Sequence, residues 1–213
     1  MRVVLDSNIL WARDLFSYLL WLADDDVIDV FWCERILSAY VRHAPDDEHI
    51  RADRARYLQQ VRAHFPNAMV DQEQVLALVP FCDNDADDRH VLATAFAAQA
   101  ERIVTRNVSD FIKTQAVAFD ETPIPAALVT LSVRAVRPDA LLTDAVFASI
   151  DLFRGLVALS EGSSRSRRTV RQCLDVMRDK YELFEFHKRM LTFAQSDACD
   201  YDIDTFKGGI IPG

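Results

Sequence analysis

No two cysteines in this sequence have the spacing of a metal-binding or redox motif. The four cysteines, Cys33, Cys82, Cys173 and Cys199, are scattered along the 213 residues and form no Cys-x-x-Cys pair. We therefore expect neither a zinc site nor a disulfide framework. Scattered cysteines are typical of a protein that works in a reducing compartment.

The sequence also lacks a long apolar run and an excess of positive charge. No apolar stretch reaches the roughly 18 residues that a membrane span needs, and the first residues do not have the pattern of a secretory signal. We therefore expect a soluble, cytoplasmic protein with no membrane partner. The net charge of −9 argues against nucleic-acid binding over the whole surface, but it leaves room for a local basic groove.

Half of the residues are hydrophobic, which is enough for one core and a smaller second unit. Strand-like runs at residues 3–5, 27–32 and 103–105 alternate with helical patterns at 14–23, 34–43, 46–64, 71–79 and 91–100. This alternation predicts an α/β fold with a parallel sheet flanked by helices.

The pattern changes after Pro123 and Pro125, which mark a joint. From there on helical spacing dominates, and we predict helices over residues 125–133, 138–160, 167–180 and 181–195. The predicted organisation is an α/β domain over residues 1–118, an all-helical unit over 119–195 and an acidic, flexible tail over 196–213.

Acidic residues crowd the start of an alanine-rich helix. Asp83, Asp85, Asp87 and Asp88 precede the apolar run at 91–100, and they repel one another unless a cation lies among them. A solvated acidic loop with helix-capping aspartates is the alternative interpretation. A calcium-binding EF-hand loop is excluded, because its sixth position holds Asp88 instead of glycine and its twelfth holds Thr94 instead of glutamate.

Further polar side chains follow the predicted strands. Asp6 comes directly after the first strand, and Asn107 and Asp110 come after the strand at 103–105. The carboxyl ends of parallel strands meet at one edge of a sheet, where ligands gather. Oxygen donors of this kind suit Mg²⁺ or Mn²⁺. Asp6 is alternatively the cap of the following helix, because aspartate is favoured there.

Four segments of the first half of the chain form a recognisable series. They are VVLDSNIL at 3–10, VFWCERILSAYV at 30–41, DADDRHVLATA at 85–95 and IVTRNVSDF at 103–111. In this order they resemble the PIN-domain nucleases, and specifically the VapC-like toxins of bacterial toxin–antitoxin pairs. The resemblance covers residues 1 to about 115, and the helical part resembles an extension found in one branch of that family.

The resemblance implies a Mg²⁺- or Mn²⁺-dependent endoribonuclease that binds a cognate antitoxin and forms a homodimer. It implies that Asp6, Asp88 and Asp110 are the catalytic and metal-binding residues, supported by Asp85, Asn107 and Asn8. The family pattern also expects a glutamate where this sequence has Ala39. A catalytically weak or inactive module that acts by binding an antitoxin or RNA is therefore the alternative. A phosphatase of another α/β family is disfavoured, because Ser7 and Asn8 follow Asp6 where a second aspartate would be needed.

One dense basic cluster lies in the helical part. We predict that its arginines contact an acidic partner, either RNA phosphate or an antitoxin tail, and a solvated loop is the alternative. The cluster consists of Arg165, Arg167, Arg168 and Arg171.

Overall fold

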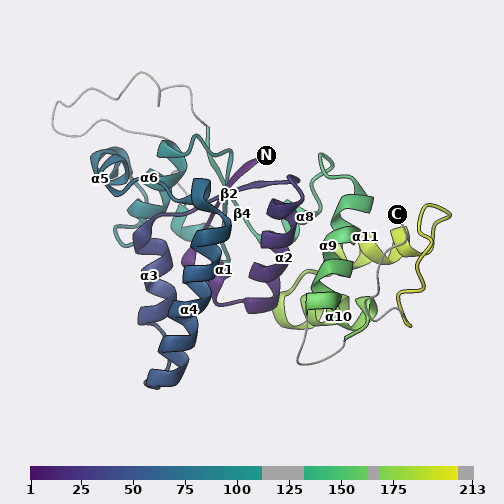
Figure 1. Ribbon diagram of the computed structural model, residues 1–213. Coiled ribbons are helices and arrows are strands. Elements are labelled where there is room, and N and C mark those ends of the chain that lie inside the picture. The colour runs from purple at the N-terminus through teal and green to yellow at the C-terminus, as the bar shows by residue number, and fades with distance from the viewer. Residues whose placement is uncertain (112–131, 163–167, 206–213) are drawn as a thin grey trace. The chain divides into compact units, whose positions relative to one another are not determined.

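The computed structural model describes residues 1–111, 132–162 and 168–205 (Figure 1). Its contacts divide the chain into two compact units, and the N-terminal part contributes to both. We call Met1–Trp11 with Ile28–Arg137 the sheet unit, and Ala12–Val27 with Pro138–Gly213 the helical unit. The predicted boundary at 118/119 lies outside the described residues.

A parallel four-stranded sheet in the order β2-β1-β3-β4 forms the centre of the sheet unit. Val3, Val4 and Leu5 are completely buried, which explains why this short β-branched run takes the middle of the sheet. Three strands agree with the predicted ones, whereas β4 was not predicted. The strands are β1 (Arg2–Leu5), β2 (Asp29–Phe31), β3 (Arg102–Val104) and β4 (Arg134–Val136).

Helices flank this sheet, so the predicted α/β fold class is confirmed. The alanine-rich helix α6 packs on β1 and β3, and its small side chains allow that close approach. Asp71 begins α5 as predicted, because its carboxylate accepts hydrogen bonds from the amides of Glu73 and Gln74. The helices are α1 (Ser7–Leu10), α3 (Glu34–Arg42), α4 (Glu48–His64), α5 (Gln72–Leu78) and α6 (Arg89–Ala97), with single turns at Pro66–Ala68, Val79–Phe81 and Val108–Phe111.

The helical unit contains α2 (Arg13–Asp24), although this helix comes early in the chain. It packs on α9 (Ser149–Gly162), where a Cβ atom on Gly155 would lie 2.9 Å from the ring of Tyr18. Glycine at this position therefore permits the close contact. The remaining helices are α8 (Pro138–Leu142), α10 (Val170–Tyr181) and α11 (Phe184–Ala194).

The single helix predicted over residues 138–160 is wrong, because α8 and α9 are separate helices. The Arg189 guanidinium donates to the carbonyl oxygens of Leu142 and Asp144 at 3.1 and 3.0 Å, and also to that of Phe147. In a continuous helix these carbonyls would accept hydrogen bonds from main-chain N–H groups of the same helix. Arg189 supplies donors in their place and so stabilises the break between α8 and α9. The predicted helix at 125–133 lies almost entirely outside the described residues.

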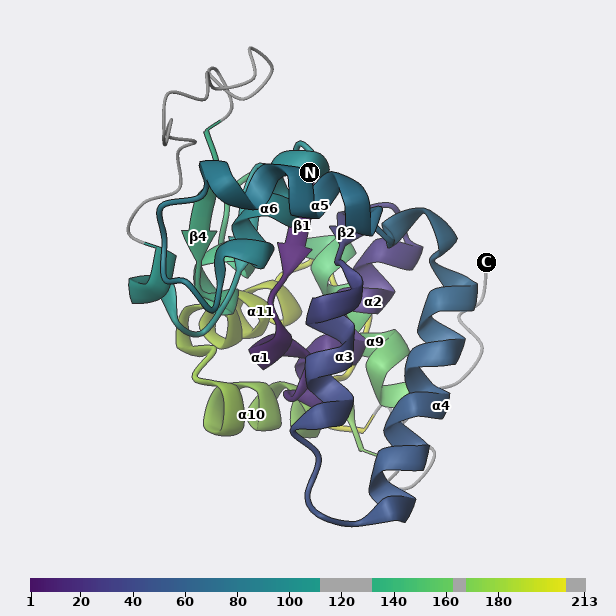
Figure 2. The ribbon, with the colours of Figure 1, turned by 90° about the vertical axis from the view of Figure 1, so that its left-hand side faces the viewer.

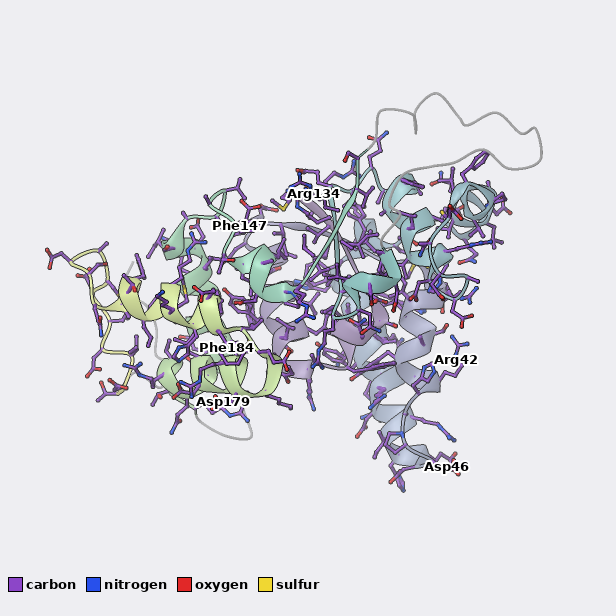
Figure 3. All side chains as sticks on the ribbon, turned by 180° about the vertical axis from the view of Figure 1, so that it is seen from behind. Arg42, Asp46, Arg134, Phe147, Asp179 and Phe184 are labelled. Carbon is purple, nitrogen blue, oxygen red and sulfur yellow. The ribbon has the colours of Figure 1, made fainter. Side chains whose placement is uncertain are left out.

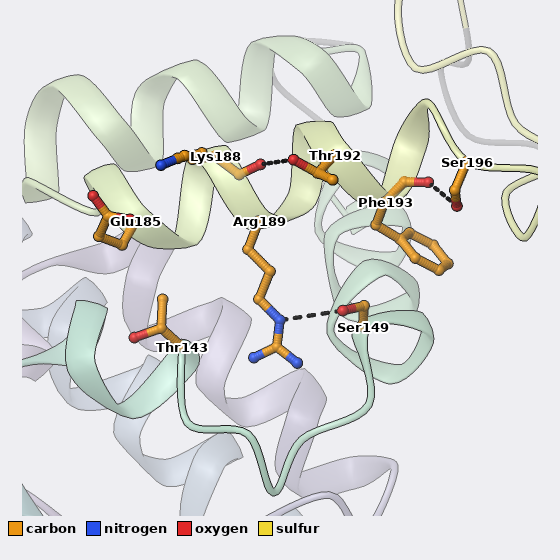
Figure 4. A pocket seen from close by; sticks show the side chains of 8 residues that line it. All are labelled: Thr143, Ser149, Glu185, Lys188, Arg189, Thr192, Phe193 and Ser196. Carbon is orange, nitrogen blue, oxygen red and sulfur yellow. Dashed lines mark hydrogen bonds between the residues drawn. The ribbon is translucent and has the colours of Figure 1, made fainter.

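The helical unit also contains an open cavity of about 580 Å³ (Figure 4). Arg189 lines it, but the guanidinium is already occupied by the carbonyls of the α8–α9 connection and by Ser149. The other polar side chains of its wall are mostly hydroxyls, and we regard this recess as a feature of the packing. Thr143, Ser149, Glu185, Lys188, Arg189, Thr192, Phe193 and Ser196 form the wall.

All four cysteines are free thiols. Burial raises the pKa of Cys82 to about 12 and that of Cys173 to about 11, so both are protonated and poorly reactive at neutral pH. Within the described residues, no helix combines the length and apolar character needed to cross a membrane.

Candidate active site

Asp6 lies at the carboxyl end of β1 and is only 3% exposed. Its main-chain N–H donates to the carbonyl of Val104 at 3.1 Å, so it extends the pairing of β1 with β3. The Ser7 amide donates to Oδ1 at 2.6 Å, and the Ser7 hydroxyl lies 3.3 Å from the same oxygen. Asp6 therefore does cap α1, as the alternative interpretation held, and the same carboxylate also faces the strand ends.

The other carboxylate oxygen of Asp6 is held by two side chains. Asn8 donates to Oδ2 at 2.6 Å, and the Thr105 hydroxyl donates to it at 2.7 Å. Thr105 accepts in turn from Asn8 at 2.9 Å and from the main-chain N–H of Asn107 at 3.0 Å. Burial raises the pKa of Asp6 and these hydrogen bonds oppose the rise, so the site begins with a rigid carboxylate whose lone pairs are largely occupied.

The Asp88 carboxylate, unlike that of Asp6, is not held by hydrogen-bond donors of the described residues. Asp88 precedes α6 without making a capping hydrogen bond. The pKa of this half-buried side chain is raised to about 6, first by burial and then by the negative charges of Asp6, Asp110, Asp85 and Asp87. The structure therefore brings the predicted acids into one electrostatically coupled group.

The loop before α6 is tied to the turn after β3. The amide of Asp85 donates to the carbonyl of Asp110 at 3.3 Å, and the Asp85 carboxylate accepts from the amide of Asp87 at 3.0 Å. The main-chain N–H of Asn107 donates to the Thr105 hydroxyl, while the Asn107 side chain is exposed. Asp85 thus connects the loop before α6 to the turn that carries Asp110, and the supporting roles of Asp85 and Asn107 stay predictions.

Buried polar atoms without partners occur in the same segment. Asn84 is 9% exposed, and among the described residues neither its amide nitrogen nor its amide oxygen has a hydrogen-bond partner. The Nε atom of Arg89 is likewise buried without a partner. Such groups cost about 1–3 kcal/mol each, so the loop is held at some expense in stability beside the acidic group.

The donor set suits a hard divalent cation. Among the described residues, no three or more His, Cys, Asp or Glu side chains are spaced to hold a metal ion. However, Mg²⁺ usually keeps several waters and needs only one or two direct carboxylates. Asp88 lacks a donor and is repelled by its neighbours, which a bound cation would reverse. A hydrated ion therefore fits these residues, and its sharing by Asp6, Asp88 and Asp110 stays a prediction.

Helix α3 lies beside α1 (Figure 2) and carries no carboxylate at the position where one was expected. Ala39 is buried there, and its carbonyl oxygen lies 3.0 Å from Nδ1 of His43. Glu34 cannot replace the missing group, because it forms an ion pair with Arg62 of α4 at 2.7 Å.

Two residues near the site were not predicted as functional. Thr105 fixes Asp6, and the only sequence signal for it is a hydroxyl residue at the end of a buried strand. Trp11 closes α1 and contacts His43 edge-on, with ring centroids 5.3 Å apart. The sequence signal for Trp11 is a large aromatic residue five positions after Asp6.

The predicted arginine cluster is only partly described. Arg165 and Arg167 lie outside the described residues. Arg168 pairs with Asp14 at 3.5 Å, and Arg171 pairs with Asp204 at 2.9 Å. Both arginines therefore have carboxylate partners within the helical unit, and their contact with an external partner stays a prediction.

The sequence was compared with known families, curated proteins and solved structures. A model of the PIN domain matches residues 2–109, which include both strand ends and the start of α6. No curated protein and no solved structure matches the chain.

Proposed function

The chain belongs to the PIN-domain family, and from this premise we propose that it is a Mg²⁺- or Mn²⁺-dependent endoribonuclease. PIN domains are generally nucleases. The observation that carries the proposal is the half-buried Asp88 carboxylate, whose pKa is raised to about 6 by burial and by the negative charges of Asp6 and Asp110. Like charges held together without donors are a suitable environment for a divalent cation.

The three acids have separate roles in this proposal. Asp6 is a fixed ligand, because Asn8 and Thr105 hold its side chain. Asp88 and Asp110 complete the ligand set. When bound, the cation supplies Lewis acidity, which activates water for in-line attack on an RNA phosphodiester and stabilises charge on the leaving oxygen.

The supporting residues position these ligands and the phosphate. Asp85 fixes the loop before α6 on the turn that carries Asp110. Asn107 presents an exposed amide next to Thr105, where it can orient water or a phosphate oxygen. Asp88 must lose its proton before it binds a cation, so cation binding should strengthen as pH rises through about 6.

A catalytically weak module that acts by binding RNA or an antitoxin is the second candidate. The observation that favours it is Ala39, which is buried where the VapC-like pattern has a glutamate. Following that resemblance, we also propose a cytoplasmic homodimer with a small cognate antitoxin. Co-purification of a small protein encoded beside this chain would test that partner.

RNA cleavage by the purified protein tests the proposal. We expect labelled RNA to be cut internally when Mn²⁺ or Mg²⁺ is added, and Asp6→Asn to abolish the cut. Asp87→Asn is the matched control, because it removes the same charge from the exposed part of the acidic loop and should retain activity. RNA that stays intact over a full metal titration, yet binds the protein, would favour the second candidate.

A further inference from the structure

Trp11 is a large exposed aromatic side chain in the segment that directly follows Asp6. It caps the C-terminal end of the single turn α1, and Asp6 caps the N-terminal end. A four-residue turn rises about 6 Å, so the indole and the Asp6 carboxylate begin from main-chain positions about one turn apart. The indole is 44% exposed, whereas Trp32 of the same unit is completely buried.

A second ring holds the indole in place. The His43 ring contacts Trp11 edge-on at 5.3 Å between centroids, with 66° between the ring planes. His43 ends α3, and its Nδ1 lies 3.0 Å from the carbonyl of Ala39, which fixes the imidazole. Trp11 and His43 therefore form a pair supported by two elements that pack together, α1 and α3.

Positive charge accompanies this aromatic pair along α3. Arg35 and Arg42 are exposed, and Figure 3 shows Arg42 on this helix. In the described chain neither guanidinium is paired with a carboxylate. Both charges act on His90 of α6, two residues after Asp88. Two exposed guanidinium groups thus lie on the helix that ends at His43, the ring that contacts the indole.

We propose that Trp11 and His43 form a stacking subsite for one unpaired base of a single-stranded RNA substrate. The inference rests on the proposed nuclease function. An aromatic face beside a cationic path is the combination that binds single-stranded nucleic acid, and Arg35 and Arg42 supply phosphate contacts along α3. Bases of a duplex are already stacked and cannot reach the indole, so the subsite selects single strands.

A protein partner would fit the surroundings of the Trp11 side chain less well than RNA does. A second copy of the chain or an apolar peptide would cover Trp11 without using the guanidinium groups of Arg35 and Arg42, which pair with no carboxylate in residues 1–111, 132–162 and 168–205. A strand of RNA uses both features, because its base contacts the indole while its phosphates contact the cations.

Binding of short labelled oligonucleotides tests the subsite. The Asp6→Asn background keeps RNA intact, and the probes are a single-stranded oligouridylate and an abasic strand of the same length, with Mg²⁺ present. We expect Trp11→Ala to raise the Kd for oligouridylate roughly 5- to 100-fold, the usual range for one lost stack. Trp11→Phe should keep most of the affinity. The salt slope should not change, because no phosphate contact is removed.

Trp21→Ala is the matched control, because Trp21 is 37% exposed but belongs to the helical unit. It should bind like the parent. The subsite is wrong if Trp11→Ala binds oligouridylate like the parent, or if it weakens the abasic strand equally. It is also wrong if Trp11→Ala changes the sedimentation of the RNA-free protein, which would identify Trp11 as a contact between copies.

The two proposals fail in different ways. If protein with intact Asp6 cleaves RNA and Trp11→Ala leaves KM unchanged, the proposed nuclease function is supported and the proposed stacking subsite is wrong. If the parent protein neither binds nor cleaves RNA, both proposals fail. A rise in KM for Trp11→Ala, with kcat nearly unchanged, supports both.

Discussion

Asp6 and Asp88 show how the same side chain serves different purposes in one site. Asp6 receives four hydrogen-bond contacts from Ser7, Asn8 and Thr105, which fix its direction and favour its charged form. Asp88 receives none from the described residues and faces four other carboxylates. A rigid carboxylate beside an uncompensated one is an arrangement that a bound cation would complete, as the proposed function requires.

The Asp88 carboxylate should destabilise the metal-free protein at neutral pH. Its pKa is about 6 in the folded state against 3.8 as the ordinary value. The folded protein thus holds this proton more tightly than the unfolded chain does. The contribution of Asp88 to the free energy of unfolding therefore falls as pH rises from 3.8 to about 6 and stays lower above that window.

Asp88→Asn should remove this penalty. We expect the metal-free variant to be more stable than the parent at pH 7 by about 1–2 kcal/mol, after allowing for solvent screening of a half-buried group. Urea unfolding of the parent and the variant between pH 3.5 and 7.5, in the presence of a chelator, measures this difference in the free energy of unfolding. Loss of stability at pH 7, or an unchanged pH dependence, would contradict the electrostatic account of Asp88.

Helix α3 has alanine at position 39, where the VapC-like pattern has a glutamate. Arg35, Ala39 and His43 lie on one stripe of this helix, four residues apart, and none of them is a carboxylate. Glu34 points to Arg62 of α4 instead. We therefore expect a weakly held cation and an activity that requires high Mn²⁺ or Mg²⁺.

Ala39→Glu should restore a carboxylate and strengthen cation binding by roughly 10- to 100-fold, by analogy with other supporting changes at metal sites. Ala39→Gln is the matched control, because it has nearly the same size without the charge. Both place a larger side chain in a buried position and should cost similar packing energy. RNA cleavage over a metal titration compares them, and equal activity in the two variants would mean that position 39 is not a ligand position.

Local patterns predict the elements that they encode directly. The run before Asp6 and the run before Asn107 are β-branched and buried, so the two strand ends and the acids after them follow from the sequence. The strand β4 was missed, because Arg134–Val136 is three residues long and includes an exposed arginine. The break between α8 and α9 was missed because Arg189, distant in sequence, binds the carbonyls there.

At the scale of the whole molecule, the chain does not divide at a single point. α2 belongs to the helical unit, while residues before and after it belong to the sheet unit. Its apolar pattern predicts a buried helix but does not say which unit buries it. Similarly, the bond from Thr105 to Asp6 joins residues 99 positions apart, so sequence patterns predict the acids of the site but not the hydroxyl that orients them.

Calorimetric titration with Mn²⁺ tests most directly whether the acidic group is a cation site. We expect the parent protein to bind Mn²⁺, and Asp6→Asn, Asp88→Asn and Asp110→Asn each to weaken that binding by roughly tenfold or more. Asp87→Asn should bind like the parent, because Asp87 is an exposed neighbour that adds charge but no ligand. Parental binding in all three site variants, or equal weakening by Asp87→Asn, would contradict the account.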